Sequence, residues 1–140
     1  MRYKFKIVFF LIFSFSFTNA NATGQYPDNI IIEGKEYYII NNPLEPFFEK
    51  FPERKPKSNI RSSALHRGYI AKFTLIDKKL YLIDIKIYVS KKDSLESGET
   101  ELISVFNKVF PDEDKVLMDL YSGVLVVLLN LESSFQDRNR

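Results

Sequence analysis

The chain has 140 residues, of which 45% are hydrophobic and 27% charged. This length and composition are typical of one globular domain and exclude a disordered or collagen-like chain. The sequence contains no Cys and one His, which excludes disulfide frameworks, thiol nucleophiles and zinc sites built from Cys or several His side chains. We therefore predict no metal site and no cofactor.

Residues 1–22 have the pattern of a secretory signal peptide. Three basic residues open the segment, an apolar run from Ile7 to Phe17 follows, and Ala20-Asn21-Ala22 supplies a small-x-small cleavage pattern. Cleavage is expected after Ala22, with Ala20 as the alternative. An uncleaved membrane anchor is disfavoured, because a span requires about 20 apolar residues. The sequence predicts an exported protein, periplasmic or extracellular, with no transmembrane helix after cleavage.

Removal of this segment changes the charge of the protein. All 18 acidic residues follow Ala22, whereas three of the 20 basic residues precede it, so 17 basic residues remain and the net charge is −1. The basic pI of the whole chain is therefore no sign of nucleic-acid binding, and no nucleic-acid partner is expected. We expect one globular domain over residues 23–131 and a polar tail over residues 132–140.

The first half of this domain contains a predicted hairpin and a predicted helix. Residues 29–33 and 36–40 are rich in β-branched and aromatic residues, and Gly34 between them suits a tight turn. Residues 44–51 then have apolar side chains at helical spacing, and Pro52 ends the pattern. These apolar residues are Leu44, Phe47, Phe48 and Phe51.

Residues 68–76 and 80–89 are the clearest predicted strands. Tyr69, Ala71 and Phe73 alternate with more polar positions in the first strand, and residues 77–79 form a plausible hairpin loop. In the second strand one face is expected to be fully apolar. It comprises Tyr81, Ile83, Ile85, Ile87 and Val89.

The last third of the domain is expected to hold one helix and two strands. Residues 99–110 carry apolar side chains at the spacing of an amphipathic helix, followed by Pro111. Residues 116–120 and 124–131 are apolar runs separated by residues 121–123, which favours another hairpin. The run 124–131 is apolar on both faces, so it should be central or covered; uncovered at an edge, it would favour aggregation.

The element order β-β-α-β-β-α-β-β predicts an α+β fold. We expect a single small domain with a mainly antiparallel sheet and two helices on one face.

Four short motifs stand out along the chain: Tyr26-Pro27-Asp28, the Asn42-to-Phe48 sequence NPLEPFF, the Lys55-to-Ser58 sequence KPKS, and SALHRGY at residues 63–69. In combination they resemble a family of small secreted bacterial proteins without an assigned activity. The resemblance covers about residues 26–125. It implies an aromatic residue where His66 stands and a longer carboxyl-terminal part with further strands, and it supplies no catalytic residues.

His66 is the one imidazole available for catalysis. A Ser-His-acid arrangement would combine it with Ser62 or Ser63 and with Asp77 or Asp84. The sequence has no Gly-x-Ser-x-Gly motif, so a partly exposed His beside a strand is the simpler interpretation. A small secreted hydrolase using His66 with Ser62 or Ser63 is the alternative function.

Charge segregation is the strongest functional signal in the sequence. Residues 50–67 contain six basic residues and one acidic residue, whereas residues 93–119 contain eight acidic and two basic residues. Outside the cytoplasm, a basic segment suits an acidic protein or an anionic envelope component. The predicted contacts in the Pro-rich segment 42–67 are Arg54, Lys55, Lys57 and Arg61. Alternatively, both segments are solvated surfaces, or they face each other within the fold.

Overall fold

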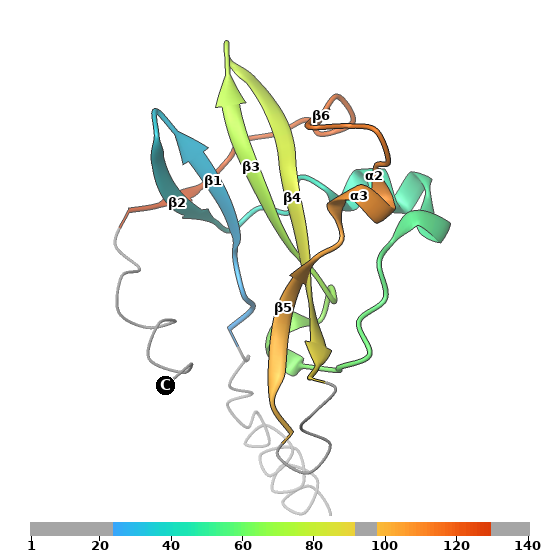
Figure 1. Cartoon of the computed structure of the whole chain (residues 1–140). Helices are drawn as coiled ribbons and strands as arrows, with labels where there is room; N and C mark the ends of the chain where they lie inside the picture. Colours follow the sequence, from blue (N-terminus) through green and yellow to red (C-terminus); the bar gives the residue numbers. More distant parts are fainter. Residues whose placement is uncertain (1–23, 92–97, 130–140) are drawn as a thin grey trace, which may run out of the picture.

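The computed structural model describes residues 24–91 and 98–129, and this described part forms one sheet (Figure 1). The strand order is β5-β4-β3-β1-β2-β7, and β6 also pairs with β4. Most neighbouring strands are antiparallel, whereas β1 and β3 are parallel. The elements are β1 (Asp28–Ile32), β2 (Lys35–Ile39), α2 (Glu45–Lys50), η1 (Pro52–Arg54), η2 (Ser63–Leu65), β3 (Ile70–Ile76), β4 (Lys79–Ser90), β5 (Thr100–Ser104), α3 (Phe106–Val109), β6 (Val116–Leu117) and β7 (Val127–Leu128).

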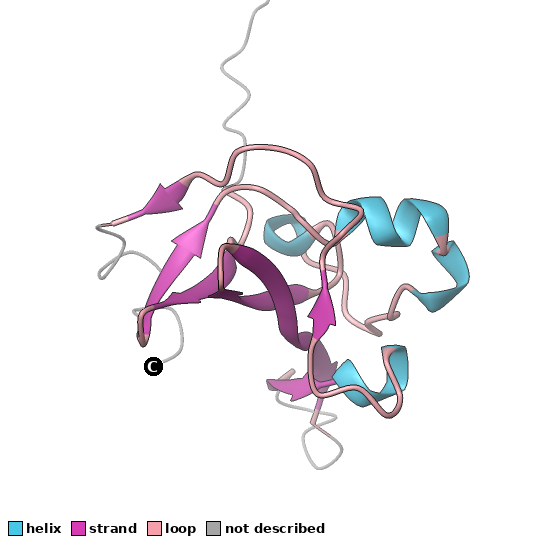
Figure 2. Cartoon of the chain, turned by 90° about the horizontal axis from the view of Figure 1, so that it is seen from above, coloured by secondary structure: helices cyan, strands magenta, loops and turns pink. Residues whose placement is uncertain are grey.

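The predicted fold class is confirmed. The described residues form a single small α+β domain, and the short helices α2 and α3 lie on one side of a mainly antiparallel sheet (Figure 2). No helix in the described ranges is long and apolar enough to cross a membrane. The predicted signal peptide (residues 1–22) and polar tail (residues 132–140) lie outside the described residues.

Both early hairpins and the first helix are confirmed. In the β1–β2 hairpin Ile32 pairs with Lys35, and Glu33 and Gly34 both have positive φ, at 50° and 77°. Two consecutive positive φ angles define the turn whose twist matches a two-residue hairpin. The β3–β4 hairpin uses Asp77 and Lys78 in the same way, with φ angles of 49° and 61°.

A β-bulge changes the predicted faces of β4. The register shifts between Lys72 and Phe73, so Phe73 pairs with Leu82 while Lys72 pairs with Asp84. Leu82 and Ile85 are consequently both fully buried. Without a bulge, Leu82 and Ile85 would lie on opposite faces of β4. The predicted apolar face is therefore wrong at Tyr81 and Ile83, where Leu82 is the buried residue, and correct at Ile85 and Ile87.

The predicted helix over residues 99–110 is wrong. Residues Thr100–Ser104 form β5, which pairs with the second half of β4, and only Phe106–Val109 are helical. The twelve-residue β4 pairs with β3 along one edge, and β5 pairs with its other edge. In the strand, Ile103 follows the core face and Leu102 is 41% exposed.

The predicted hairpin at residues 121–123 is also wrong. Val116–Leu117 form β6 on β4, whereas Val127–Leu128 form β7 on β2, so the intervening chain crosses the molecule (Figure 1). The apolar run around β7 is not central; it lies at the edge of the sheet.

The core lies between the sheet and the helices. Tyr69, Ala71 and Phe73 point into it with no exposed surface, as their alternation predicts. Phe48 of α2 meets Tyr69 edge-to-face, with ring centroids 5.3 Å apart. This packing fixes α2, and with it the start of the basic segment, against the sheet.

Candidate functional site

Arg54, one of the four predicted contact residues, is half-buried and makes its contacts within the protein. Its guanidinium lies 5.1 Å from the ring centroid of Phe47 and 4.9 Å from that of Phe110. It also donates a hydrogen bond to the carbonyl oxygen of Val109, at the end of α3. Cations suit the carbonyl end of a helix, so this contact completes α3 and joins it to η1. Arg54 thus joins the basic segment to residues 109 and 110 through a backbone carbonyl and an aromatic ring, with no acidic side chain in the contact.

Lys55 is likewise engaged within the protein. Its Nζ lies 3.1 Å from Oε1 and 3.3 Å from Oε2 of Glu45, and over the rings of Phe48 and Tyr69. The Tyr69 hydroxyl donates to Glu45 Oε1 at 2.6 Å. Burial, together with this hydrogen bond, raises the pKa of Tyr69 well above its usual range, so the hydroxyl keeps its proton.

Lys57 and Arg61 are the two predicted contacts that face solvent. Both are exposed, and neither has an ion pair or side-chain hydrogen bond within residues 24–91 and 98–129. The chain between them is fixed by Ser58, whose hydroxyl donates to the carbonyl oxygen of Tyr88 at 2.7 Å and accepts from the Ile60 N–H at 3.0 Å. The two cations therefore extend from a segment that is anchored to β4.

Asp28 and Arg67 form a buried ion pair that the charge pattern does not single out. Asp28 is fully buried; its Oδ2 lies 2.7 Å from an Arg67 nitrogen, and its Oδ1 accepts the Ala71 N–H at 2.8 Å. Arg67 also donates to Asn42 Oδ1 and, at 2.8 Å, to the Tyr26 carbonyl oxygen. Burial raises the pKa of Asp28 from 3.8 to about 6, although Arg67 and the Ala71 N–H both act to lower it.

The polar contacts gather residues from all four of the motifs that carry the family resemblance. Tyr26 and Asp28 belong to the first motif, Asn42 and Glu45 to the second, Lys55 to the third, and Arg67 and Tyr69 to the fourth. Their contacts join motif residues up to 41 positions apart in the sequence, as for Tyr26 and Arg67. Their shared contacts indicate that the motifs maintain the fold.

His66 does not form the catalytic arrangement that the alternative function requires. Within the described residues its backbone N–H donates to Gln25 Oε1 at 3.0 Å, and its imidazole has no hydrogen bond with Ser62 or Ser63. Asp77 follows β3 at the end away from His66, roughly 20 Å along the strand at about 3.3 Å per residue. Asp84 instead accepts the Ser104 hydroxyl at 2.6 Å.

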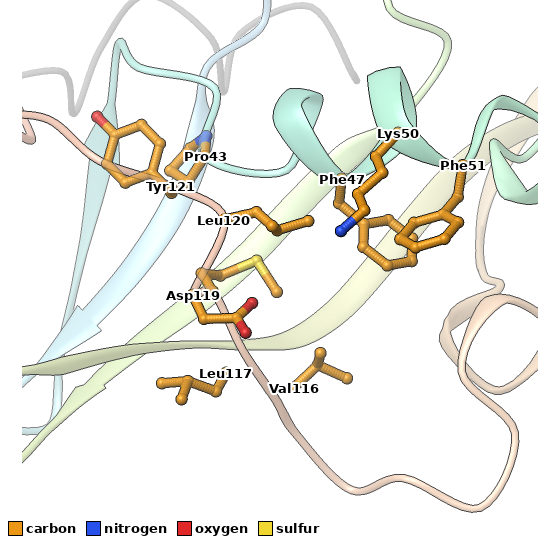
Figure 3. A pocket seen from close by; sticks show the side chains of 10 residues that line it. Pro43, Phe47, Lys50, Phe51, Val116, Leu117, Asp119, Leu120 and Tyr121 are labelled. Atoms are coloured by element: carbon orange, nitrogen blue, oxygen red, sulfur yellow. The ribbon is translucent and has the colours of Figure 1, made fainter.

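Two of the surface cavities in the described part of the chain are formed partly by residues of the motifs. The larger, of about 570 Å³, lies beside Arg67 and is lined by Tyr26, Ile40, His66 and Leu128, among others. A second, of about 250 Å³, lies between α2 and the chain after β6, with Phe47 and Lys50 facing Asp119 (Figure 3). No group of three or more His, Cys, Asp or Glu side chains within the described ranges is arranged to hold a metal ion.

No protein-family model, curated protein or solved structure matches the chain. The resemblance to the family of small secreted proteins stays a prediction. The described residues present two exposed cations, Lys57 and Arg61, on a segment anchored to β4, and they contain no assembled Ser-His-acid group.

Proposed function

We propose that this chain is an exported, non-catalytic protein that binds an anionic partner through its basic segment. An acidic protein and an anionic envelope component both have the required chemistry. The observation that carries the proposal is the exposure of Lys57 and Arg61 on either side of Ser58, which anchors their segment to β4. Cations presented on a fixed backbone lose less conformational entropy on binding than cations on a flexible tail.

The four predicted basic residues have different roles in this proposal. Arg61 supplies a planar fork for carboxylate or phosphate oxygens, and Lys57 supplies a compact point charge. Arg54 and Lys55 stabilise the fold of the segment and do not contact the partner, because Arg54 is bonded to the Val109 carbonyl oxygen and Lys55 to Glu45. Reversing all four charges would therefore damage the fold as well as the binding surface.

The test is a charge reversal limited to the exposed pair. The wild type and the Lys57→Glu/Arg61→Glu variant are each expressed as the full chain with an affinity tag. Each purified protein is then incubated with an envelope extract, and the captured partner is measured. Loss of two favourable charges is expected to reduce partner capture about tenfold or more, with the wild-type interaction weakening as salt rises.

The matched control is Lys78→Glu/Lys79→Glu, which reverses two exposed charges at the β3–β4 turn. It should capture the partner as the wild type does. Vesicles of anionic or zwitterionic lipid, offered in place of the extract, separate a lipid partner from a protein. Equal capture by the wild type and the Lys57/Arg61 variant would refute the proposal.

A further inference from the structure

The cavity between α2 and the chain after β6 has a mainly apolar lining. Phe47 and Phe51 line it from α2 and the residue that ends this helix, and Val116 and Met118 line it from the other side. Its volume is about 250 Å³, slightly below the range of about 300–1,000 Å³ that is usual for drug-sized ligands. The cavity therefore suits a compact ligand with an apolar side chain.

Both sides of this cavity are anchored to the rest of the fold. On the α2 side, the ring of Phe47 packs against that of Phe110, with centroids 4.9 Å apart. On the other side, the Met118 N–H donates to the Leu80 carbonyl oxygen at 2.9 Å. Because neither side has to be ordered when a ligand enters, little conformational entropy is lost on binding.

Two side chains of opposite charge lie at the opening of the cavity. Figure 3 shows Lys50, from the last turn of α2, and Asp119, from the chain after β6, on opposite sides of it. Among the described residues, Lys50 Nζ contacts the ring of Phe51, 5.5 Å from its centroid, and Asp119 has no ion pair or side-chain hydrogen bond. A cation and an anion are therefore both available to a ligand beside one apolar cavity.

This combination of charges selects against ligands with a single charge. A ligand that carries only a carboxylate would be attracted by Lys50 and repelled by Asp119, and a ligand that carries only an ammonium group would meet the reverse. A ligand with both charges satisfies both side chains. The apolar lining strengthens these contacts, because it lowers the local dielectric constant.

We propose that this cavity binds a free amino acid with an apolar side chain, such as leucine. Lys50 pairs with the ligand carboxylate and Asp119 with the ligand ammonium group. The ligand side chain lies in the cavity against Phe47 and Met118. A free amino acid fits this arrangement because its two charged groups and its side chain are all attached to one carbon atom. The site is separate from the Lys57/Arg61 surface, and this inference does not depend on the proposed function.

The first test compares leucine with two analogues on the wild type, purified from cells expressing the full chain. One analogue, 4-methylpentanoate, lacks the amino group, and the other, 3-methylbutylamine, lacks the carboxylate. Titrations followed by nuclear magnetic resonance measure the affinities. Leucine is expected to bind about tenfold or more tightly than either analogue. No saturable binding of leucine up to about 10 mM, or equal binding of all three compounds, would overturn the proposal.

Two substitutions then assign each charge of the ligand to its side chain. Asp119→Asn should weaken leucine binding about tenfold and leave 4-methylpentanoate binding at least as strong as in the wild type. Lys50→Gln should weaken the binding of both compounds. Loss of 4-methylpentanoate binding in the Asp119→Asn variant would show that the substitution acts through the fold, and it would overturn the assignment.

The matched controls are Lys108→Gln and Asp114→Asn. Lys108 is an exposed lysine in the last turn of α3, Asp114 is an exposed aspartate before β6, and neither lines the cavity. Both control variants should bind leucine as the wild type does. Equal weakening in the control and cavity variants would show a general effect of net charge and would refute the site.

Discussion

Arg67 joins three segments of the chain that are distant in sequence. It bonds to Asp28 at the start of β1, to Asn42 before α2 and to the backbone of Tyr26. The side chain of Asp28 has no exposed surface and that of Arg67 is 11% exposed. An ion pair in this setting makes a small net contribution, because desolvation offsets the attraction, yet removing one partner leaves an uncompensated buried charge.

Replacement of Arg67 by Met is therefore expected to lower the free energy of unfolding by about 3–5 kcal/mol. Arg61→Met removes the same charge from an exposed side chain and should change it by about 0.5 kcal/mol or less. Denaturant unfolding of both variants measures the difference. Similar stabilities of the two variants would contradict the structural role of Arg67.

Asp28 gives the fold a specific dependence on pH. Its pKa is raised from 3.8 to about 6 in the folded state, so the folded protein binds this proton more tightly than the unfolded chain. The associated stability is fully present below about pH 3.8 and is lost as the pH rises through about 6. The difference between the two pKa values corresponds to about 3 kcal/mol in the free energy of unfolding.

The Asp28→Asn variant isolates this contribution. The stability of the wild type relative to the variant should decline between about pH 4 and pH 7, as measured by urea unfolding in a series of buffers. A constant difference across this range, or one that increases with pH, would contradict the assignment.

At the scale of single residues, the sequence predicted charge but not its partners. Arg54, Lys55, Lys57 and Arg61 look alike as a basic run, yet two of them face aromatic rings or a carboxylate and two face solvent. That division depends on where α3 and β3 lie. The signal for Arg67 was present in the motif Arg67-Gly68-Tyr69, but only the fold shows that it meets Asp28.

Among the elements, those governed by local chemistry were predicted correctly. Gly34 provides a positive φ at the β1–β2 turn, and Pro52 ends the pattern of α2, so neighbouring residues suffice to define each. Residues 99–110 fit a helical spacing equally well, but β5 is chosen by the free edge of β4, which no local pattern reveals. The sequence likewise predicted that β6 and β7 pair with each other, because no local pattern shows that β6 pairs with β4 and β7 with β2.

Glu101 offers a direct test of the strand assignment. Its side chain is exposed on β5, where a β-branched residue is favoured over Ala by up to about 1 kcal/mol. In a helix the preference is reversed. Glu101→Thr should therefore be more stable than Glu101→Ala in thermal or denaturant unfolding. A more stable Ala variant would favour the helix that the spacing predicts.

For the whole molecule, the fold class followed from the sequence while the strand order did not. Alternating apolar residues in segments such as 70–76 are enough to indicate a sheet with one covered face. The order requires β1 to lie parallel to β3, across the connection that contains α2 and the basic segment. This crossing brings the four motifs together and leaves Lys57 and Arg61 on the surface.

The proposed partner chemistry depends on export, which residues 1–22 predict. The most direct test is the intact mass and amino-terminal sequence of the protein recovered from the periplasm and culture medium of cells expressing the full chain. We predict a chain that begins at Thr23, after cleavage at Ala22. A protein that begins at Met1 and is recovered only from the cytosol would contradict the account.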